Sequence, residues 1–127
     1  MIFGIGIDII INKRIRAAFE RWGERFISRI YTEAERSYCI GERFSETSLA
    51  ARFAAKEAFI KAAGSFFPYN SIEVCNEPGG RPFLLLYGTA GDFLKQSGVN
   101  RVHLSLSHES THSVAIVVLE SQEVKIQ

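Results

Sequence analysis

The chain of 127 residues has little cysteine and no long apolar run. Only Cys39 and Cys75 are present, far apart and outside any CxxC spacing, which argues against a disulfide framework or a structural zinc site. We therefore expect two free thiols. No apolar run approaches the roughly 20 residues that span a bilayer, and residues 1–3 lack the basic start of a signal peptide. The sequence predicts a cytoplasmic protein without a membrane segment.

An excess of charge is missing too, because 15 basic and 14 acidic side chains leave a net charge of +1. This balance excludes a broad basic surface that binds nucleic acid, although a local basic cluster can still bind an acidic partner. Repeats, low-complexity tracts and a glycine-rich phosphate loop are also absent, since Gly4-Ile5-Gly6 has no third glycine. With 46% hydrophobic and 23% charged residues, we expect a single domain over residues 1–127.

The most informative stretch that is present covers residues 48–64. It is dense in Ala, Leu, Lys and Glu and ends at Gly64, which predicts one helix from about Thr47 to Ala63. Glu57 and Lys61 stand one turn apart on this helix. Two interpretations are open: a solvated charged face, or a mostly buried helix whose carboxylate needs a partner or a metal, because Ala and Phe surround the charges.

Residues 2–11 are rich in β-branched side chains and apolar on both faces, which predicts a central strand. Asp8 is the exception in this strand. It shares a face with Gly4 and Gly6, and we expect the two glycines to leave open space beside the carboxylate. Asp8 is either a strand-end residue bonded to a turn or, as we favour, a metal ligand or catalytic acid at the edge of a cleft.

Two shorter helices are expected next. Asn12 is predicted to cap a helix that runs through Trp22. The spacing of Thr32 and Glu35 matches a capping box and predicts a helix to about Gly41. Basic residues of the first helix face away from its apolar stripe and either keep the surface soluble or form a docking face for an acidic protein. They are Lys13, Arg14, Arg16 and Arg21.

The second half of the chain predicts mainly strands. The expected elements are a hairpin of strands 71–75 and 83–87, a surface helix over 89–97, and an antiparallel pair of strands at 102–108 and 113–120. We expect the last strand to be buried on both faces. His108 continues the apolar face of Leu104 and Leu106, so it is either a hydrogen-bonded core residue or a phosphate ligand at the strand end.

Five motifs together resemble one family, the small bacterial 4′-phosphopantetheinyl transferases known as holo-acyl-carrier-protein synthases. The motifs are Gly4-Ile5-Gly6-Ile7-Asp8-Ile9, Tyr31-Thr32-x-x-Glu35, Arg52-Phe53-Ala54-Ala55-Lys56-Glu57-Ala58-Phe59-x-Lys61-Ala62, Gly80-Arg81-Pro82 and Leu104-Ser105-Leu106-Ser107-His108. The resemblance implies an α+β fold, with an antiparallel sheet packed on a long central helix, and a homotrimer with active sites at the subunit interfaces. It also implies transfer of 4′-phosphopantetheine from coenzyme A to a serine of apo-acyl carrier protein, with Mg²⁺ required and 3′,5′-ADP released.

The resemblance assigns roles to particular residues. Asp8 and Glu57 match the family's magnesium ligands, Lys61 would meet a phosphate oxygen, and Arg14 matches a position that faces the acidic carrier protein. Phosphoryl transfer depends mainly on positioning and charge neutralisation, which suits two carboxylates and a lysine. Either Glu57 or a metal-polarised water is the expected base for the serine hydroxyl, and Glu35 is a third option.

Coenzyme A is expected to bind where the resemblance places its contacts. These are Arg52, Lys61, Gly64, Pro82 and His108. The chain departs from the family pattern at Ile11, where a glutamate is usual, and at Phe66, where Gly64-Ser65-Phe66 stands in place of Gly-Thr-Gly. We expect Ile11 to alter the surroundings of the metal and Phe66 to alter the phosphate site. These departures motivate the alternative of a catalytically idle module that binds coenzyme A or a carrier protein. A purely structural trimer-forming domain without a ligand is a third interpretation.

Overall fold

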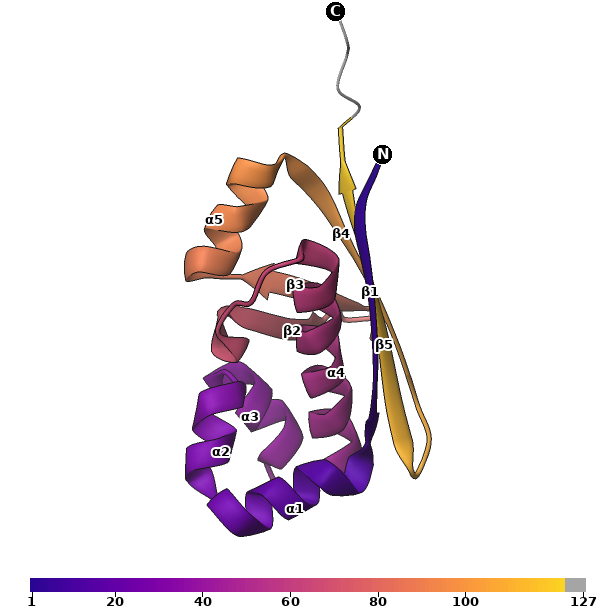
Figure 1. Ribbon diagram of the computed structural model, residues 1–127. Helices are drawn as coiled ribbons and strands as arrows, with labels where there is room; N and C mark the ends of the chain where they lie inside the picture. Colours follow the sequence, from indigo (N-terminus) through magenta and orange to yellow (C-terminus); the bar gives the residue numbers. More distant parts are fainter. Residues whose placement is uncertain (123–127) are drawn as a thin grey trace, which may run out of the picture.

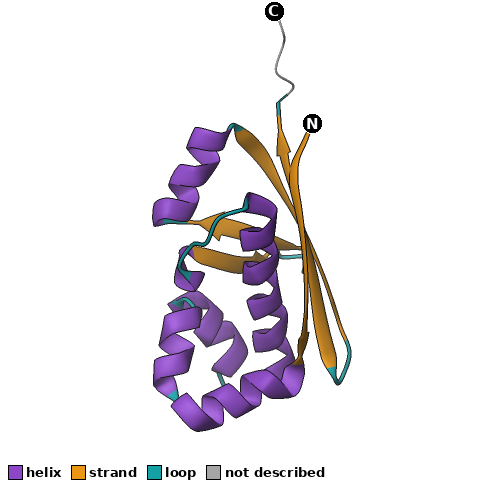
Figure 2. Ribbon diagram, viewed as in Figure 1, coloured by secondary structure: helices purple, strands orange, loops and turns teal. Residues whose placement is uncertain are grey.

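The computed structural model describes residues 1–122 and has an α+β fold (Figure 1). The elements are β1 (Ile2–Ile11), α1 (Asn12–Trp22), α2 (Glu24–Ile30), α3 (Glu33–Ile40), α4 (Glu46–Ala63), the short 3-10 helix η1 (Tyr69–Ser71), β2 (Ile72–Asn76), β3 (Pro82–Leu86), α5 (Gly88–Ser97), β4 (Val99–His108) and β5 (His112–Ser121). The long helix α4 lies along a three-stranded antiparallel sheet (Figure 2). This confirms the predicted class, and most predicted element boundaries agree within a few residues.

The sheet has the strand order β1-β5-β4, so β1 is an edge strand and the prediction of a central strand is wrong. All the helices lie on one side of this sheet (Figures 1 and 2). Within residues 1–122 nothing covers the opposite face, where Ile5, Ile7 and Ile9 are about 60% exposed (59%, 59% and 62%). The central strand β5 likewise buries Val117 but exposes Ile116, so it is not buried on both faces as predicted.

Helix α4 lies unusually close to β1 because two strand residues have no side chain. A Cβ atom at Gly4 would come within 1.9 Å of the Ala62 carbonyl oxygen, and one at Gly6 within 1.8 Å of the Ala58 carbonyl oxygen. The sequence led us to expect open space beside Asp8, and this expectation is wrong. The backbone of helix α4 fills the space above the two glycines. This close approach brings Asp8 next to the side chains of α4.

The limits of α4 follow from its sequence. The Ser45 hydroxyl accepts a hydrogen bond from the Ser48 amide at 3.2 Å, and Gly64 closes the helix in the left-handed region with a φ of 77°. Most of the helix is buried, including Arg52 and Lys56, so the interpretation as a buried helix is the correct one of the two. Its charged residues consequently need partners.

Asn12 has a different role from the predicted helix cap. It is the first residue of α1, and Ile11 occupies the capping position without a side-chain hydrogen bond. The buried Asn12 amide instead donates to the Glu109 carbonyl at 2.9 Å and accepts from the Ser113 hydroxyl at 2.7 Å. It thereby fastens the start of α1 to the turn between β4 and β5.

The two cysteines do not form a disulfide. Cys39 is buried and Cys75 is partly buried, and both are free thiols. Over residues 1–122, every helix is either too short or too polar to span a bilayer.

Candidate functional site

Two carboxylates and a lysine gather where β1 runs alongside α4. Lys61 donates to Oδ1 of Asp8 at 3.0 Å and to the Ile7 carbonyl, also at 3.0 Å. Glu57, one helical turn before Lys61, accepts a 2.6 Å hydrogen bond on Oε1 from the Tyr69 hydroxyl. We call Asp8, Glu57, Lys61 and Tyr69 the carboxylate cluster. It joins residues from the first strand, the long helix and the segment after it.

The pKa of the Tyr69 hydroxyl reflects the two carboxylates of the cluster. Its pKa is raised to about 12 by partial burial, by the hydrogen bond to Glu57 and by the negative charges of Glu57 and Asp8. The phenol therefore stays protonated at neutral pH and remains a donor to Glu57. Both carboxylates act on the same hydroxyl, as expected if they face one region of the surface.

The cluster contains few groups that could hold a metal. In the described part of the chain no three His, Cys, Asp or Glu side chains come together for that purpose. Asp8 and Glu57 each use one carboxylate oxygen in the hydrogen bonds above, and no residue within 1–122 donates to the other oxygen. Two carboxylates with free oxygens match the preference of Mg²⁺ for hard oxygen ligands, because Mg²⁺ usually takes one or two carboxylates and completes its shell with water and phosphate.

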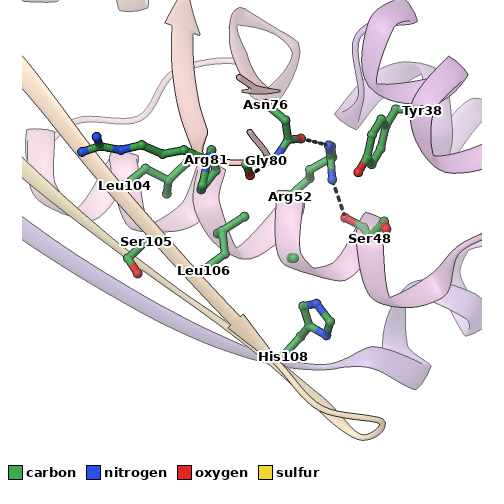
Figure 3. Close-up of a pocket in the computed structure, with 12 residues that line it drawn as sticks. Tyr38, Ser48, Arg52, Asn76, Gly80, Arg81, Leu104, Ser105, Leu106 and His108 are labelled. Atoms are coloured by element: carbon green, nitrogen blue, oxygen red, sulfur yellow. Dashed lines mark hydrogen bonds between the residues drawn. The ribbon is translucent and has the colours of Figure 1, made fainter. Parts of the chain in front are cut away.

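A second region is a cavity of about 580 Å³ between α4, the β2–β3 hairpin and the end of β4 (Figure 3). The Arg52 side chain is 5% exposed there and donates to the Asn76 side chain at 2.9 Å. The Tyr38 ring covers its guanidinium at 4.3 Å. Arg52 Nε is buried and has no hydrogen-bond partner among residues 1–122. An unpaired buried donor is costly, so the cavity is suited to an anionic ligand.

The residues expected to bind coenzyme A divide between these two regions. Arg52, Pro82 and His108 line the cavity, and His108 is exposed at the end of β4 rather than buried in the core. Lys61 belongs to the carboxylate cluster, and Gly64 ends α4 outside the cavity lining. Arg52 precedes Lys61 by roughly two and a half turns of about 3.6 residues each, so the two side chains leave opposite sides of the helix.

Glu35, the third option for a base, is excluded by its surroundings. Its side chain is 1% exposed and pairs with Lys56 at 2.8 Å. It also completes the predicted capping box by accepting from the Thr32 amide, and its other oxygen accepts from the Val74 amide. A carboxylate that is hydrogen-bonded through both oxygens and has no access to solvent cannot take a proton from a substrate.

The two departures from the family pattern have different consequences. Ile11 lies on the opposite face of β1 from Asp8, because side chains alternate along a strand, so the expected effect on the surroundings of Asp8 is not found. Phe66 is 68% exposed, and its ring meets Tyr69 edge-on at 5.6 Å. Only the second departure touches the carboxylate cluster.

Sequence reasoning missed three residues of these regions. Tyr38 and Asn76 contact Arg52, and Tyr69 binds Glu57. Tyr69 closely follows Phe66 and Phe67 in the sequence, but nothing local connects this aromatic run to a glutamate twelve residues before the tyrosine. Tyr38 and Asn76 carried no comparable signal.

Comparisons with known proteins agree with the geometry. A model of the 4′-phosphopantetheinyl transferase superfamily matches residues 4–117. A holo-[acyl-carrier-protein] synthase of Halothermothrix orenii is 45% identical over 123 residues, which is 94% of this chain and 98% of the relative. The crystal structure of holo-[acyl-carrier-protein] synthase from Neisseria meningitidis has a TM-score of 0.86 and 35% identity, covering 95% of this chain and 100% of that one.

A further solved relative carries a ligand. The holo-(acyl-carrier-protein) synthase of Bacillus anthracis, in complex with CoA (3′,5′-ADP), has a TM-score of 0.77 and 40% identity over 96% of this chain and 99% of that one. The fold and the superfamily match make this chain a phosphopantetheinyl transferase. The relatives narrow the assignment, and the chain belongs to the holo-[acyl-carrier-protein] synthase family. The resemblance inferred from the five motifs is thus confirmed.

Proposed function

We propose that the chain transfers 4′-phosphopantetheine from coenzyme A to a serine hydroxyl of an apo-acyl carrier protein, with Mg²⁺ required and 3′,5′-ADP released. Family membership supports the reaction class. The observation that carries the site assignment is the carboxylate cluster, because Asp8 and Glu57 act on one hydroxyl and Lys61 stands beside Asp8. This reaction breaks the pyrophosphate of coenzyme A, so negative charge grows on the departing phosphate while the serine oxygen attacks.

Asp8 and Glu57 would hold the Mg²⁺ through the carboxylate oxygens that the hydrogen bonds leave open. Bound there, Mg²⁺ would supply positive charge for the pyrophosphate oxygens. Lys61 is half exposed and uses two of its three donors on Asp8 and Ile7. Within residues 1–122 the third donor has no partner, so it is left for a phosphate oxygen. Either Glu57 or a metal-polarised water would accept the serine proton, the two bases that the resemblance leaves open.

The cavity around Arg52 would receive the nucleotide phosphates. The buried Nε of Arg52, which has no partner in the described part of the chain, supports this assignment, since an anion would satisfy it. His108 at the rim can donate to the same anion, and Pro82 contributes an apolar wall.

A homotrimer would reconcile the two separated regions. Arg52 and Lys61 leave opposite sides of α4, so one chain does not direct both toward a single ligand. The uncovered face of the sheet carries Ile5, Ile7, Ile9 and Ile116, an apolar surface that a second copy would bury. We therefore place each active site between two copies of the chain, with the cavity of one beside the carboxylate cluster of the next. Sedimentation equilibrium tests this arrangement, and a monomer at working concentration would contradict it.

The carrier protein would dock on the basic side of α1. Arg14 is exposed, whereas Arg16 is already paired with Glu46 at 2.6 Å and so is less available. Arg21 stacks on the exposed Trp22, next to a second cavity of about 580 Å³ lined partly by Arg25. Arginines around an aromatic surface suit an acidic partner. An Arg14→Glu variant is expected to raise the KM for the carrier protein without changing the KM for coenzyme A.

A mass-spectrometric transfer assay tests the proposed function. The protein is incubated with coenzyme A, Mg²⁺ and an apo-acyl carrier protein, and the carrier is expected to gain the phosphopantetheine mass. Asp8→Ala and Glu57→Ala should abolish the gain, while Asp92→Ala, which removes an exposed carboxylate on α5, should not. Full activity in Asp8→Ala or Glu57→Ala would refute the metal assignment. Coenzyme A binding without transfer to any carrier would instead favour the idle binding module.

A further inference from the structure

Tyr69 makes the only hydrogen bond from residues 1–122 to the Glu57 carboxylate, at 2.6 Å. We infer that Tyr69 is a positioning residue, which holds Glu57 in the orientation needed to bind a divalent cation together with Asp8. This inference rests on the proposed function, because it assumes that Glu57 is a metal ligand.

The main chain of Tyr69 is anchored to the buried core. Its carbonyl oxygen accepts a 2.9 Å hydrogen bond from Lys56, which is itself buried and paired with Glu35. The next turn of chain is closed by Ser71, whose amide and hydroxyl both donate to the Pro68 carbonyl. The backbone position from which the tyrosine ring starts is therefore set by the folded core.

The ring is held on two sides as well. Phe53 packs against it with ring centroids 5.4 Å apart, and Phe66 meets it edge-on at 5.6 Å. Phe66 is the residue that departs from the family pattern, so in this chain the departure supports the ring of Tyr69. With main chain and ring both fixed, the hydroxyl has little freedom and reaches Glu57 at one defined point.

The hydroxyl restricts a side chain that is otherwise mobile. Glu57 is only partly buried, and a free glutamate loses rotamer entropy when a cation orders it. The bond to Oε1 orders the carboxylate in advance and leaves Oε2 for the cation, as Lys61 does for Asp8. Groups that orient metal ligands in this way typically change metal affinity by about 10- to 100-fold.

The test is a titration with Mn²⁺ at saturating coenzyme A, followed by the electron paramagnetic resonance signal of free Mn²⁺. Tyr69→Phe removes the hydroxyl but keeps the ring contacts, and it is expected to weaken Mn²⁺ binding by about 10-fold or more. Tyr87→Phe is the matched control, since the Tyr87 hydroxyl donates to a different carboxylate, Glu73, at 3.0 Å. It should bind Mn²⁺ like the wild type. The transfer assay should show a higher Mg²⁺ requirement for Tyr69→Phe with an unchanged KM for coenzyme A.

The outcomes separate this inference from the proposed function. If the wild type and Tyr69→Phe bind Mn²⁺ equally while Glu57→Ala loses binding, the positioning role is wrong and the metal assignment stands. If the wild type binds no more Mn²⁺ than Asp8→Ala does, both fail. A lower Tm of Tyr69→Phe together with unchanged Mn²⁺ affinity would assign the hydroxyl to stability alone and would also overturn the inference.

Discussion

Helix α4 carries two lysines that pair with carboxylates in opposite ways. The side chains of Lys56 and Glu35 are 0% and 1% exposed, whereas those of Lys61 and Asp8 are 52% and 17% exposed. Lys56 donates all three of its hydrogen bonds within the protein, to Glu35 and to the carbonyl oxygens of Tyr69 and Ile72. Lys61 keeps one donor without a partner among residues 1–122. Two lysines of one helix thus differ: all donors of Lys56 are used within the protein, whereas Lys61 can still donate to a ligand.

This difference indicates that the Lys56–Glu35 pair is structural and that the Lys61–Asp8 pair is available for ligands. Burial lowers the pKa of Lys56, and the charge and hydrogen bond of Glu35 oppose that effect. A buried ion pair adds little stability overall, but it leaves a costly unpaired charge when one partner is removed. An exposed pair contributes little to stability and can exchange its partners for a ligand. We therefore expect the buried pair to govern folding and the exposed pair to govern activity.

The largest loss of stability is expected at Lys56. Lys56→Met would leave the carboxylate of Glu35 buried without its cation, and we expect the free energy of unfolding to fall by about 3–5 kcal/mol. Urea unfolding followed by circular dichroism measures the loss. Lys95→Met, on the exposed side of α5, is the control and should cost less than about 1 kcal/mol. Similar losses in the two variants would remove the distinction between buried and exposed lysines.

A smaller loss is expected where β1 and α4 touch. Gly6→Ala places a methyl group 1.8 Å from the Ala58 carbonyl oxygen, so the helix must move away from the strand. Overpacking of this kind costs about 1–3 kcal/mol, and the shift should also separate Asp8 from Lys61 and reduce transfer. Gly79→Ala, whose added methyl would meet no atom within 4 Å, is the control in the same unfolding and transfer assays. Wild-type behaviour of Gly6→Ala would show that the close approach is not required.

A pH-dependent loss is expected at Glu73, which lies beside the buried pair. Burial by itself would raise its pKa, but hydrogen bonds from Thr32, Tyr87 and Cys75 and the charge of Lys56 lower it below the ordinary 4.5. A carboxyl with a lowered folded-state pKa stabilises the protein above its unfolded pKa and loses that contribution as the pH falls through the folded value. The wild type should therefore lose more stability below about pH 4.5 than Glu73→Gln does.

Unfolding free energies at neutral and acid pH measure this difference. Tyr87→Phe removes one of the hydrogen bonds to Glu73 and should reduce the acid-induced loss in part. Parallel pH profiles for the wild type and Glu73→Gln would contradict the role of Glu73.

The smallest effect on stability is expected at Lys61. Lys61→Met should change the free energy of unfolding by less than about 1 kcal/mol, because the Lys61 side chain is 52% exposed. Its transfer rate should nevertheless fall by about 100-fold or more, since a charge that meets the developing phosphate is removed. Unfolding and transfer are measured on the same preparation. A large loss of stability with normal transfer would reverse the comparison between the two lysines.

Most features that depend on neighbouring residues were predicted, although Asn12 does not cap α1 and helix α2 was not predicted. The composition of α4 and its closing Gly64 gave its limits, and the spacing of Thr32 and Glu35 gave the capping box. The capping box did not indicate the second role of Glu35, which is to pair with Lys56 from another helix. For the candidate site, the resemblance named Asp8, Glu57 and Lys61 but not the tyrosine that orders Glu57.

By itself, then, the sequence determined most of the elements and their order, because helix caps, turns and alternation act over a few residues; helix α2 was the exception. The tertiary structure alone decided that β1 is an edge strand, that α4 fills the space above Gly4 and Gly6, and that Arg52 and Lys61 leave opposite sides of the helix. It also decided which lysine is buried. The physical reason is that such outcomes depend on backbone approach and burial between segments far apart in the chain, which no local pattern encodes.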